Sequence, residues 1–116
     1  MWDLPLKGNL FMTKISYPEA EALIAEYVTY PLNSTQLDAL ATFVANVGET
    51  GILRQAGCSL SNVVVALNEG RLDAAAVYML DYSYSDQHDP TTGHWIRIQA
   101  ELRNRLLEAA QFLTGV

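Results

Sequence analysis

The polar segment 83–93 carries the residues whose types are best suited to chemistry. Asp86, His88 and Asp89, with His94 just beyond, combine carboxylate and imidazole groups, which bind zinc and other divalent ions. Their spacing matches no closed metal motif, and polar loops collect such residues by default. We therefore expect a solvated loop here, without a metal or another cofactor.

Three tyrosines lie beside the same segment. Tyr78 and Tyr82 are one helical turn apart, and Tyr84 follows closely. Aromatic rings with a polar tip anchor protein interfaces and can stack on sugar faces. The plainer alternative places Tyr78 in the core and the other two along a loop. We predict that a partner contacts this region through the residues Tyr82, Tyr84, Asp86, His88 and Asp89.

Other catalytic signatures are missing from the sequence. Serine, histidine and aspartate all occur, but no G-x-S-x-G elbow supports a nucleophile, and no glycine-rich loop is suited to phosphate. Cys58 is the sole cysteine, which excludes an intramolecular disulfide and a thiolate metal cluster. We expect it to be a small buried hydrophobic residue.

Size and charge limit the function further. The 116 residues, half of them apolar, predict one domain, 1–116, with an irregular arm over 1–15. A net charge of −6 argues against direct nucleic-acid binding; it either solubilises the protein or favours a basic protein partner. No apolar run is long enough to span a membrane, and the N-terminus does not resemble a signal peptide, so we expect a cytoplasmic protein.

Hydrophobic periodicity predicts an all-α protein, a compact bundle of five to six helices. Helices are expected from Ser16 to Tyr30, from Asn33 or Ser34 to Gly48, from Ser59 or Ser61 to Asn68, over about 72–82 and over about 94–113, with a short helical piece at best over 52–56. The last helix should bury a face containing Trp95, Leu102, Leu106 and Leu113. The arginines 97, 103 and 105 should lie at its surface and pair with Glu101 and Glu108.

Several of these segments resemble one known family. Residues 36–48 (QLDALATFVANVG) are similar to the central helix of the phage-type lysozymes, glycoside hydrolase family 24, whose pattern is Q-x-DALVSF-x-FN-x-G. Residues 58–60, 67–70 and 74–76 resemble the STLL…LN-x-G-x-x-x-AA stretch of that family. Arg103, Arg105, Glu108 and Phe112 correspond to its closing helix, and residues 19–23 to the helix after its active-site region. The resemblance implies the fold of the helical C-terminal lobe.

The catalytic part of the family pattern has no counterpart in this sequence. In the family, the catalytic glutamate precedes a segment of the type Y-x-D-x-x-G-x-x-T-x-G-x-G-H, and no stretch here matches it. Segment 83–93 also lacks the usual glycine–lysine pattern of the family. The resemblance therefore transfers a fold but no catalytic residue to this chain.

The carboxylates before residue 40 do not replace that segment in the prediction. Glycoside hydrolysis needs two carboxyl groups facing each other across a cleft, one of them with a raised pKa. Glu19 completes a capping box with Ser16, and Glu21 and Glu26 lie off the apolar helix face and should be solvated. Asp38 is expected in the first turn of a helix, where the dipole keeps it ionised.

Two hypotheses about function follow. The first is a catalytically inactive lysozyme-like protein of phage or prophage origin that binds and inhibits a host protein in the cytoplasm, for example a component of a defence system. The alternative is a peptidoglycan-binding or virion-associated module derived from an endolysin, with residual muramidase activity as a more remote option. In either case we expect that the missing N-terminal lobe of the lysozyme fold leaves an apolar face exposed, which would support a homodimer.

Overall fold

A computed structural model describes residues 14–54, 59–88, 90–91 and 95–115, with the backbone alone described for 84–88 and 95–97. This part of the chain is mainly helical, which confirms the all-α prediction. The helices are α2 (Tyr17–Tyr27), α3 (Ser34–Val47), α4 (Asn62–Asn68), α5 (Leu72–Met79) and α6 (Gln99–Thr114), with short 3-10 turns η1 (Gly48–Gly51) and η2 (Leu80–Ser83). The strands are β1 (Leu53–Arg54), β2 (Ser59–Leu60), β3 (Tyr84–His88) and β4 (Trp95–Arg97).

Local capping sets the starts of α2 and α3, and both helices start where the sequence predicts. The Ser16 hydroxyl accepts the Glu19 amide at 3.2 Å, and the Glu19 carboxylate accepts the Ser16 amide at 3.0 Å. Asn33 and Gln36 repeat this reciprocal capping box at the start of α3, with distances of 2.8 and 3.0 Å. Each box satisfies amides that have no partner within the helix.

Glycines end two of the helices where the sequence predicts an end. Gly48, with a φ of 83°, caps the C-terminus of α3. Gly70, with a φ of 77°, follows α4 and lets the chain turn into α5. Both angles lie in the left-handed region, which a side chain disfavours.

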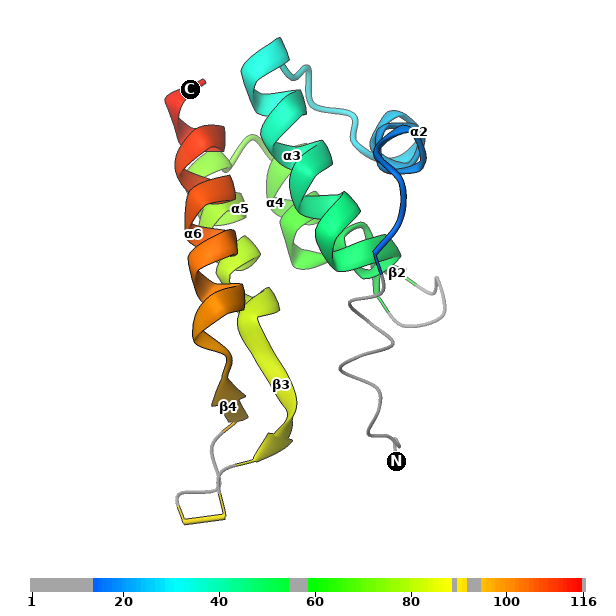
Figure 1. The fold of residues 1–116 in the computed structure, drawn as a ribbon. Coiled ribbons are helices and arrows are strands. Elements are labelled where there is room, and N and C mark those ends of the chain that lie inside the picture. The colour runs from blue at the N-terminus through cyan, green and yellow to red at the C-terminus, as the bar shows by residue number, and fades with distance from the viewer. Residues whose placement is uncertain (1–13, 55–58, 89, 92–94, 116) are drawn as a thin grey trace.

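Helix α3 is the centre of the fold. Its buried side chains Leu40, Phe43, Val44 and Val47 form the middle of the core. Helix α6 runs alongside α3 and forms with it the most extensive contact among the described elements. The α4–α5 pair lies behind these two helices, and α2 crosses the opposite side of α3 (Figure 1).

The last helix is shorter than predicted and presents a different face to the core. It begins at Gln99, because residues 95–97 pair as β4 with β3 in an antiparallel hairpin, and the Ile98 amide donates to the Ser83 carbonyl at 2.7 Å. Its buried side chains are Arg105, Glu108, Ala109 and Phe112. Leu106 and Leu113 are 48% and 43% exposed, so the predicted buried face is wrong at these positions.

Strands form in two segments for which none was predicted, the polar loop 83–93 and the segment 52–56. Part of the predicted polar loop forms β3, and the β3–β4 hairpin extends beyond the ends of the helices (Figure 1). The segment expected to be helical at best over 52–56 contributes β1, which pairs with β2. In β4, Trp95 and Ile96 are an aromatic and a β-branched residue, which favour a strand over the helix predicted from about residue 94.

The beginning of the described chain is tied to α3. The Ile15 amide donates to the Ala45 carbonyl at 3.0 Å. Most of the predicted irregular arm, residues 1–13, lies outside the described residues, as does Cys58. The described helices include none with both the length and the apolar character needed to cross a bilayer.

Candidate functional site

A buried ion pair lies beside the base of the β3–β4 hairpin. Arg105 and Glu108, three residues apart on α6, form two hydrogen bonds: Nε to Oε1 at 2.7 Å and Nη2 to Oε2 at 3.1 Å. The Arg105 side chain is fully buried. The prediction that Arg105 is a surface charge is therefore wrong, whereas its predicted pairing with Glu108 is confirmed.

Further partners complete this network across three elements. Asn46 of α3 donates from Nδ2 to Glu108 Oε2 at 2.7 Å. Arg105 Nη1 donates to Glu101 at 3.2 Å and to the Tyr82 carbonyl at 3.5 Å, and the guanidinium carbon lies 5.9 Å from the centroid of the Phe43 ring. Because the buried charges are paired and hydrogen-bonded, the network holds α6 and η2 against α3.

Tyr82, one of the predicted partner-binding residues, is part of this packing. Its ring meets Phe43 edge to face, with centroids 5.1 Å apart and an interplanar angle of 85°. Its hydroxyl donates to the Thr50 carbonyl at 2.6 Å. Burial raises the pKa of Tyr82 to about 12. The tyrosine is thus half-buried and forms the support of the hairpin.

The other predicted contact residues lie further along the hairpin. The backbone of Tyr84, Asp86 and His88 belongs to β3, and Asp89 lies outside the described residues. His94 is outside them as well. Binding of a partner through these residues stays a prediction. Within the described side chains, no group of three His, Cys, Asp or Glu residues is placed to hold a metal ion.

The carboxylate of Asp38 links three helices. It accepts the Tyr17 hydroxyl of α2 at 2.5 Å and the Gln111 amide of α6 at 3.1 Å. These two hydrogen bonds lower the pKa of Asp38, and the same bond to Asp38 raises the pKa of Tyr17 to about 12. Asp38 is the fifth residue of α3 rather than part of its first turn, so side-chain donors, not the helix terminus, keep it ionised.

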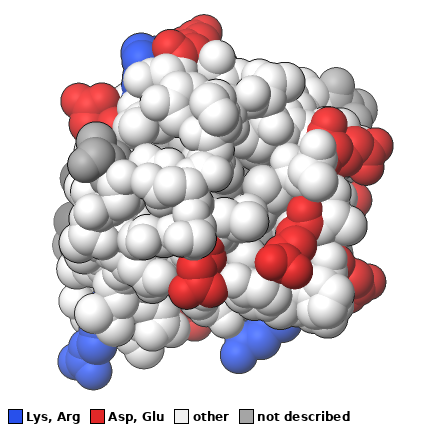
Figure 2. All heavy atoms as spheres, turned by 90° about the horizontal axis from the view of Figure 1, so that it is seen from above, with Lys and Arg blue, Asp and Glu red and all other residues white. Residues whose placement is uncertain are grey.

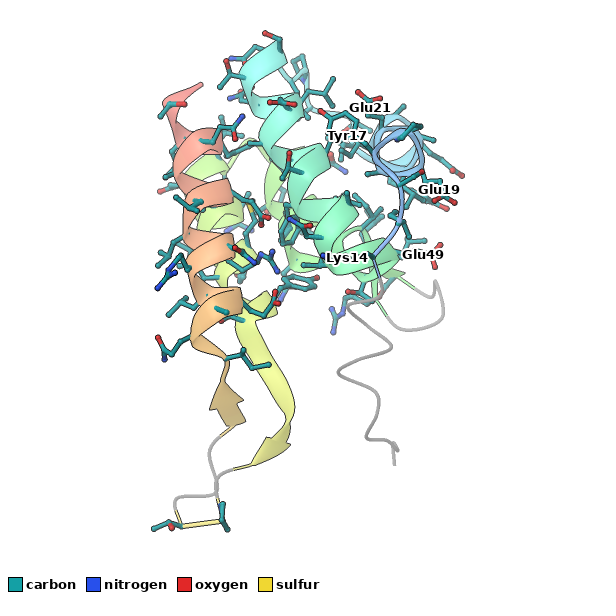
Figure 3. The ribbon with its side chains drawn as sticks, viewed as in Figure 1. Lys14, Tyr17, Glu19, Glu21 and Glu49 are labelled. Atoms are coloured by element: carbon teal, nitrogen blue, oxygen red, sulfur yellow. The ribbon has the colours of Figure 1, made fainter. Side chains whose placement is uncertain are left out.

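The acidic side chains of α2 point to solvent. Figure 3 shows Glu19 and Glu21 on α2, with Tyr17 directed from α2 toward α3. Hydrogen bonds from the Ser16 backbone and side chain lower the pKa of Glu19, as its role in the capping box requires. Glu21 and Glu26 are exposed, which confirms their predicted solvation.

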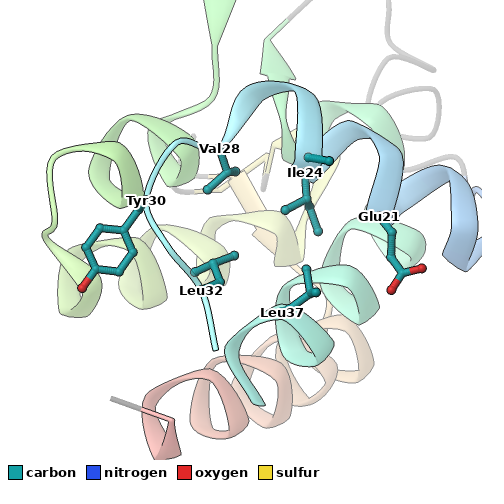
Figure 4. A pocket seen from close by; sticks show the side chains of 7 residues that line it. Glu21, Ile24, Val28, Tyr30, Leu32 and Leu37 are labelled. Carbon is teal, nitrogen blue, oxygen red and sulfur yellow. The ribbon is translucent and has the colours of Figure 1, made fainter. Parts of the chain in front are cut away.

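A hollow of about 360 Å³ lies between α2, the connection that follows it, and the start of α3 (Figure 4). It is lined by Glu21, Ile24, Ala25, Val28, Tyr30, Leu32 and Leu37. The sequence does not predict this hollow, because its pattern indicates only that Ile24 and Leu37 are core positions of two separate helices. The hollow depends on how α2 crosses α3, which no local pattern encodes.

Asn68 fixes the connection that forms one wall of the hollow. Its side-chain oxygen accepts the Thr29 amide at 2.8 Å, and its amide donates to the Tyr27 carbonyl at 3.1 Å. In the sequence, the LNEG segment that includes Asn68 marks the end of a helix and resembles a motif of the lysozyme family. Its second role, joining residues 39 to 41 positions apart, could not be inferred from the spacing.

Comparison with known proteins agrees with this architecture. The chain is similar to the muramidase domain of SpmX from Asticaccaulis excentricus, with a TM-score of 0.67 and 28% identical residues. The match covers 84% of this chain and 59% of that chain. No curated protein matches. The family pattern described as phage lysozyme matches residues 8–101. The chain therefore belongs to the phage lysozyme family.

Proposed function

We propose that this chain is a non-hydrolytic member of the phage lysozyme family that binds and inhibits another protein. The partner is a host protein, with components of anti-phage defence as the first class to test, and the site of action is the host cytoplasm. The family scaffold then serves as a binding surface, because fold alone does not fix activity.

The state of the described carboxylates carries this proposal. A glycosidase acid needs a carboxyl group with a raised pKa, placed opposite a second carboxylate. Here the pKa values of Glu19 and Asp38 are both lowered by hydrogen bonds. Glu108, the buried carboxylate, accepts bonds from Arg105 and Asn46 and is occupied by them. Glu19 and Asp38 are thus stabilised as anions rather than as proton donors.

Charge and the hairpin support a protein as the ligand. The net charge of −6 favours a basic partner surface. The β3–β4 hairpin extends from the helices and carries Tyr84, Asp86 and His88 in its first strand. Its base is held by the packing of Tyr82 on Phe43, which gives a binding element a rigid support.

A second candidate is a peptidoglycan-binding or virion-associated module. The observation in its favour is the family membership itself, together with the similarity to a muramidase domain. A residual muramidase reaction would have to use carboxylates such as Glu26 or Asp38. Its signature would be loss of lytic activity in Glu26→Gln or Asp38→Asn.

Purified bacterial sacculi separate these functions. The protein is co-sedimented with sacculi, and the supernatant is assayed for released muropeptides, with an active phage lysozyme as the positive control. The proposal expects neither sedimentation nor release. Release would overturn the non-hydrolytic assignment, and sedimentation without release would favour the wall-binding module.

The protein partner is then sought at the hairpin. A photo-crosslinking amino acid replaces Tyr84, and a control variant carries it at the exposed Arg71, on another part of the surface. The proposal expects one host protein to be crosslinked from position 84 and not from position 71. Equal products from both positions would contradict a contact at the hairpin. Light scattering on the same samples tests the proposed homodimer, which a monomer mass at high concentration would exclude.

A further inference from the structure

The hollow beside α2 has an apolar interior. Ile24 lies deepest, with 4% of its surface exposed, whereas Val28, Leu32 and Leu37 are partly exposed around it. Figure 4 shows these side chains converging on the hollow from α2, the connection and α3. Glu21 and Ala25 are exposed at its edge, so the hollow opens to the surface. Its volume of about 360 Å³ suits a few side chains of a peptide.

The walls of this hollow are held in place by hydrogen bonds from residues outside the lining. The Asn68 side chain forms hydrogen bonds with the backbone of Tyr27 and Thr29, and these bonds restrict the motion of the connection between α2 and α3. The bond from Tyr17 to Asp38 holds the beginning of α2 on α3. A site that is already ordered loses less conformational entropy when a ligand binds.

The charges around the hollow are of one sign. The segment 17–53, which contains α2, the connection and α3, includes Glu19, Glu21 and Glu26 but no lysine or arginine. Glu21 forms no ion pair with any described residue. Figure 2, a view from above, shows acidic side chains outnumbering basic ones on this end of the molecule. A bound segment therefore gains by placing a cation near Glu21, and a second copy docked through the same face would oppose like charges.

We propose that this hollow binds a basic amphipathic segment of a protein partner. One or two aliphatic side chains, spaced as on one face of a helix, enter between Ile24, Leu32 and Leu37, and a flanking Lys or Arg pairs with Glu21. A small-molecule ligand is disfavoured, because such ligands are mostly buried in their sites, whereas this hollow opens to the surface along Glu21 and Ala25. This inference rests on the protein-binding function proposed above and assigns it a second surface, separate from the hairpin.

The test begins with a random-peptide display selection on the immobilised full chain. The enriched peptides are synthesised with a fluorophore, and their affinities are measured by fluorescence anisotropy. We expect enrichment of peptides with two aliphatic residues three or four positions apart and a neighbouring Lys or Arg. Enrichment of acidic peptides, or of none, would overturn the proposal. No peptide would be enriched if residues 1–13 or a second copy of the chain filled the hollow. Light scattering would show the second copy as a dimer mass.

Matched variants on α2 locate the bound peptide. Ala25→Lys places a long cation at the edge of the hollow, and Ala22→Lys makes the same change at an exposed position of α2 outside the lining. We expect Ala25→Lys to weaken binding by about tenfold or more, as loss of a central contact does, and Ala22→Lys to change it by less than about threefold. Equal losses would contradict binding in the hollow. Circular dichroism confirms that both variants fold.

A second matched pair tests the charge. Glu21→Gln should weaken binding by about threefold in low salt, and the difference should shrink in high salt, because an exposed ion pair is weak and screened. Glu26→Gln, which removes an exposed carboxylate outside the lining, should have a smaller effect. If Glu26→Gln weakens binding as much as Glu21→Gln, the attraction is general and the assigned ion pair is wrong.

These outcomes are separable from a failure of the proposed function. If the hairpin crosslinks a host protein while no peptide depends on Ala25, the protein-binding function stands and this surface is excluded. If muropeptides are released from sacculi, the proposed function fails, whatever the peptide result.

Discussion

Helices α6 and α2 both pack on α3, but different interactions hold them there. On the α6 side, Arg105, Glu108 and Asn46 form a buried and hydrogen-bonded network over the Phe43 ring. On the α2 side, Ala20 and Ile24 are the buried residues of the helix, and the polar link from Tyr17 to Asp38 is exposed.

The two interfaces therefore differ in how they respond to disturbance. A desolvated ion pair with several hydrogen bonds has one satisfactory geometry, so α6 is fixed in orientation. A small apolar contact tolerates adjustment, and an exposed hydrogen bond can exchange with water at little cost. We expect α2 to open at lower free energy than α6.

The largest effect is expected at Arg105. Arg105→Met leaves Glu108 buried without its cation, which should reduce the free energy of unfolding by about 3–5 kcal/mol. Urea denaturation measures the change. Arg103→Met, on the exposed side of the same helix, should stay within about 0.5 kcal/mol. Adding Glu108→Leu to Arg105→Met should recover part of the loss, and failure to recover would assign the loss to packing rather than to the unpaired charge.

Ile24→Ala probes the apolar anchor of α2. Removal of a buried aliphatic side chain should cost about 2–4 kcal/mol, less where the site can collapse. Hydrogen exchange should show the amides of α2 losing protection before those of α6. Val77→Ala, at a position 62% exposed, is the control and should leave both measurements nearly unchanged. Equal loss of protection in α2 and α6 would mean that the two interfaces form a single cooperative unit.

Asn68→Ala tests the support behind the connection. Two hydrogen bonds to the backbone of residues 27 and 29 are lost, with an expected cost of about 1–2 kcal/mol. Asn62→Ala, at an exposed position of the same helix, serves as the control in urea denaturation. A similar cost for both variants would indicate an effect on α4 rather than on the connection.

The smallest effect concerns the exposed link between α2 and α3. Asp38→Asn should lower the pKa of Tyr17 from about 12 toward its ordinary value of 10.0, because a neutral amide replaces the carboxylate that accepts the hydrogen bond of the Tyr17 hydroxyl. The pKa of Tyr82, raised mainly by burial, should stay near 12. Carbon-13 NMR titration of the tyrosine rings resolves the two residues. A parallel fall for Tyr82 would mean a wider rearrangement.

The hydrogen bond between Tyr17 and Asp38 stabilises α2 only within a limited pH range. Because the folded pKa of Asp38 lies below its ordinary value of 3.8, this contribution is present above that pH and is lost as the pH falls through the folded value. Because the pKa of Tyr17 is raised, its contribution is present below pH 10.0 and is lost as the pH rises toward about 12. Asp38→Asn should flatten the dependence of stability on pH at both ends.

Local features of this fold could be predicted from the sequence, whereas features that depend on tertiary contacts could not. The starts of α2 and α3 are encoded within four residues, by Ser16 with Glu19 and by Asn33 with Gln36. The burial of Arg105 is not encoded in this way, since an arginine three residues before a glutamate is equally typical of a solvated helix surface. Its environment comes from Phe43 and Asn46, about 60 positions away in the chain.

In the candidate site too, local features could be predicted from the sequence and features that depend on tertiary contacts could not. Solvation of Glu21 and Glu26 followed from the helical period, and the sequence correctly placed Glu19 in a cap. The start of α3 was predicted correctly, but Asp38 is its fifth residue and so lies beyond the first turn. Its partners come from α2 and α6. The hollow required the crossing of two helices, and the extent of α6 required knowledge that residues 95–97 pair with β3.

The pairing of α3 with α6 also has a consequence for the growing polypeptide. Helix α3 ends at Val47, and its main packing partner begins only at Gln99, after α4, α5 and the hairpin have been made. Phe43 and Asn46 must therefore wait for Arg105 and Glu108 to leave the ribosome. Contacts this distant in sequence slow folding, and the nascent chain leaves the α6-facing side of its central apolar helix uncovered until α6 has been made. That interval is when this chain has most need of a chaperone.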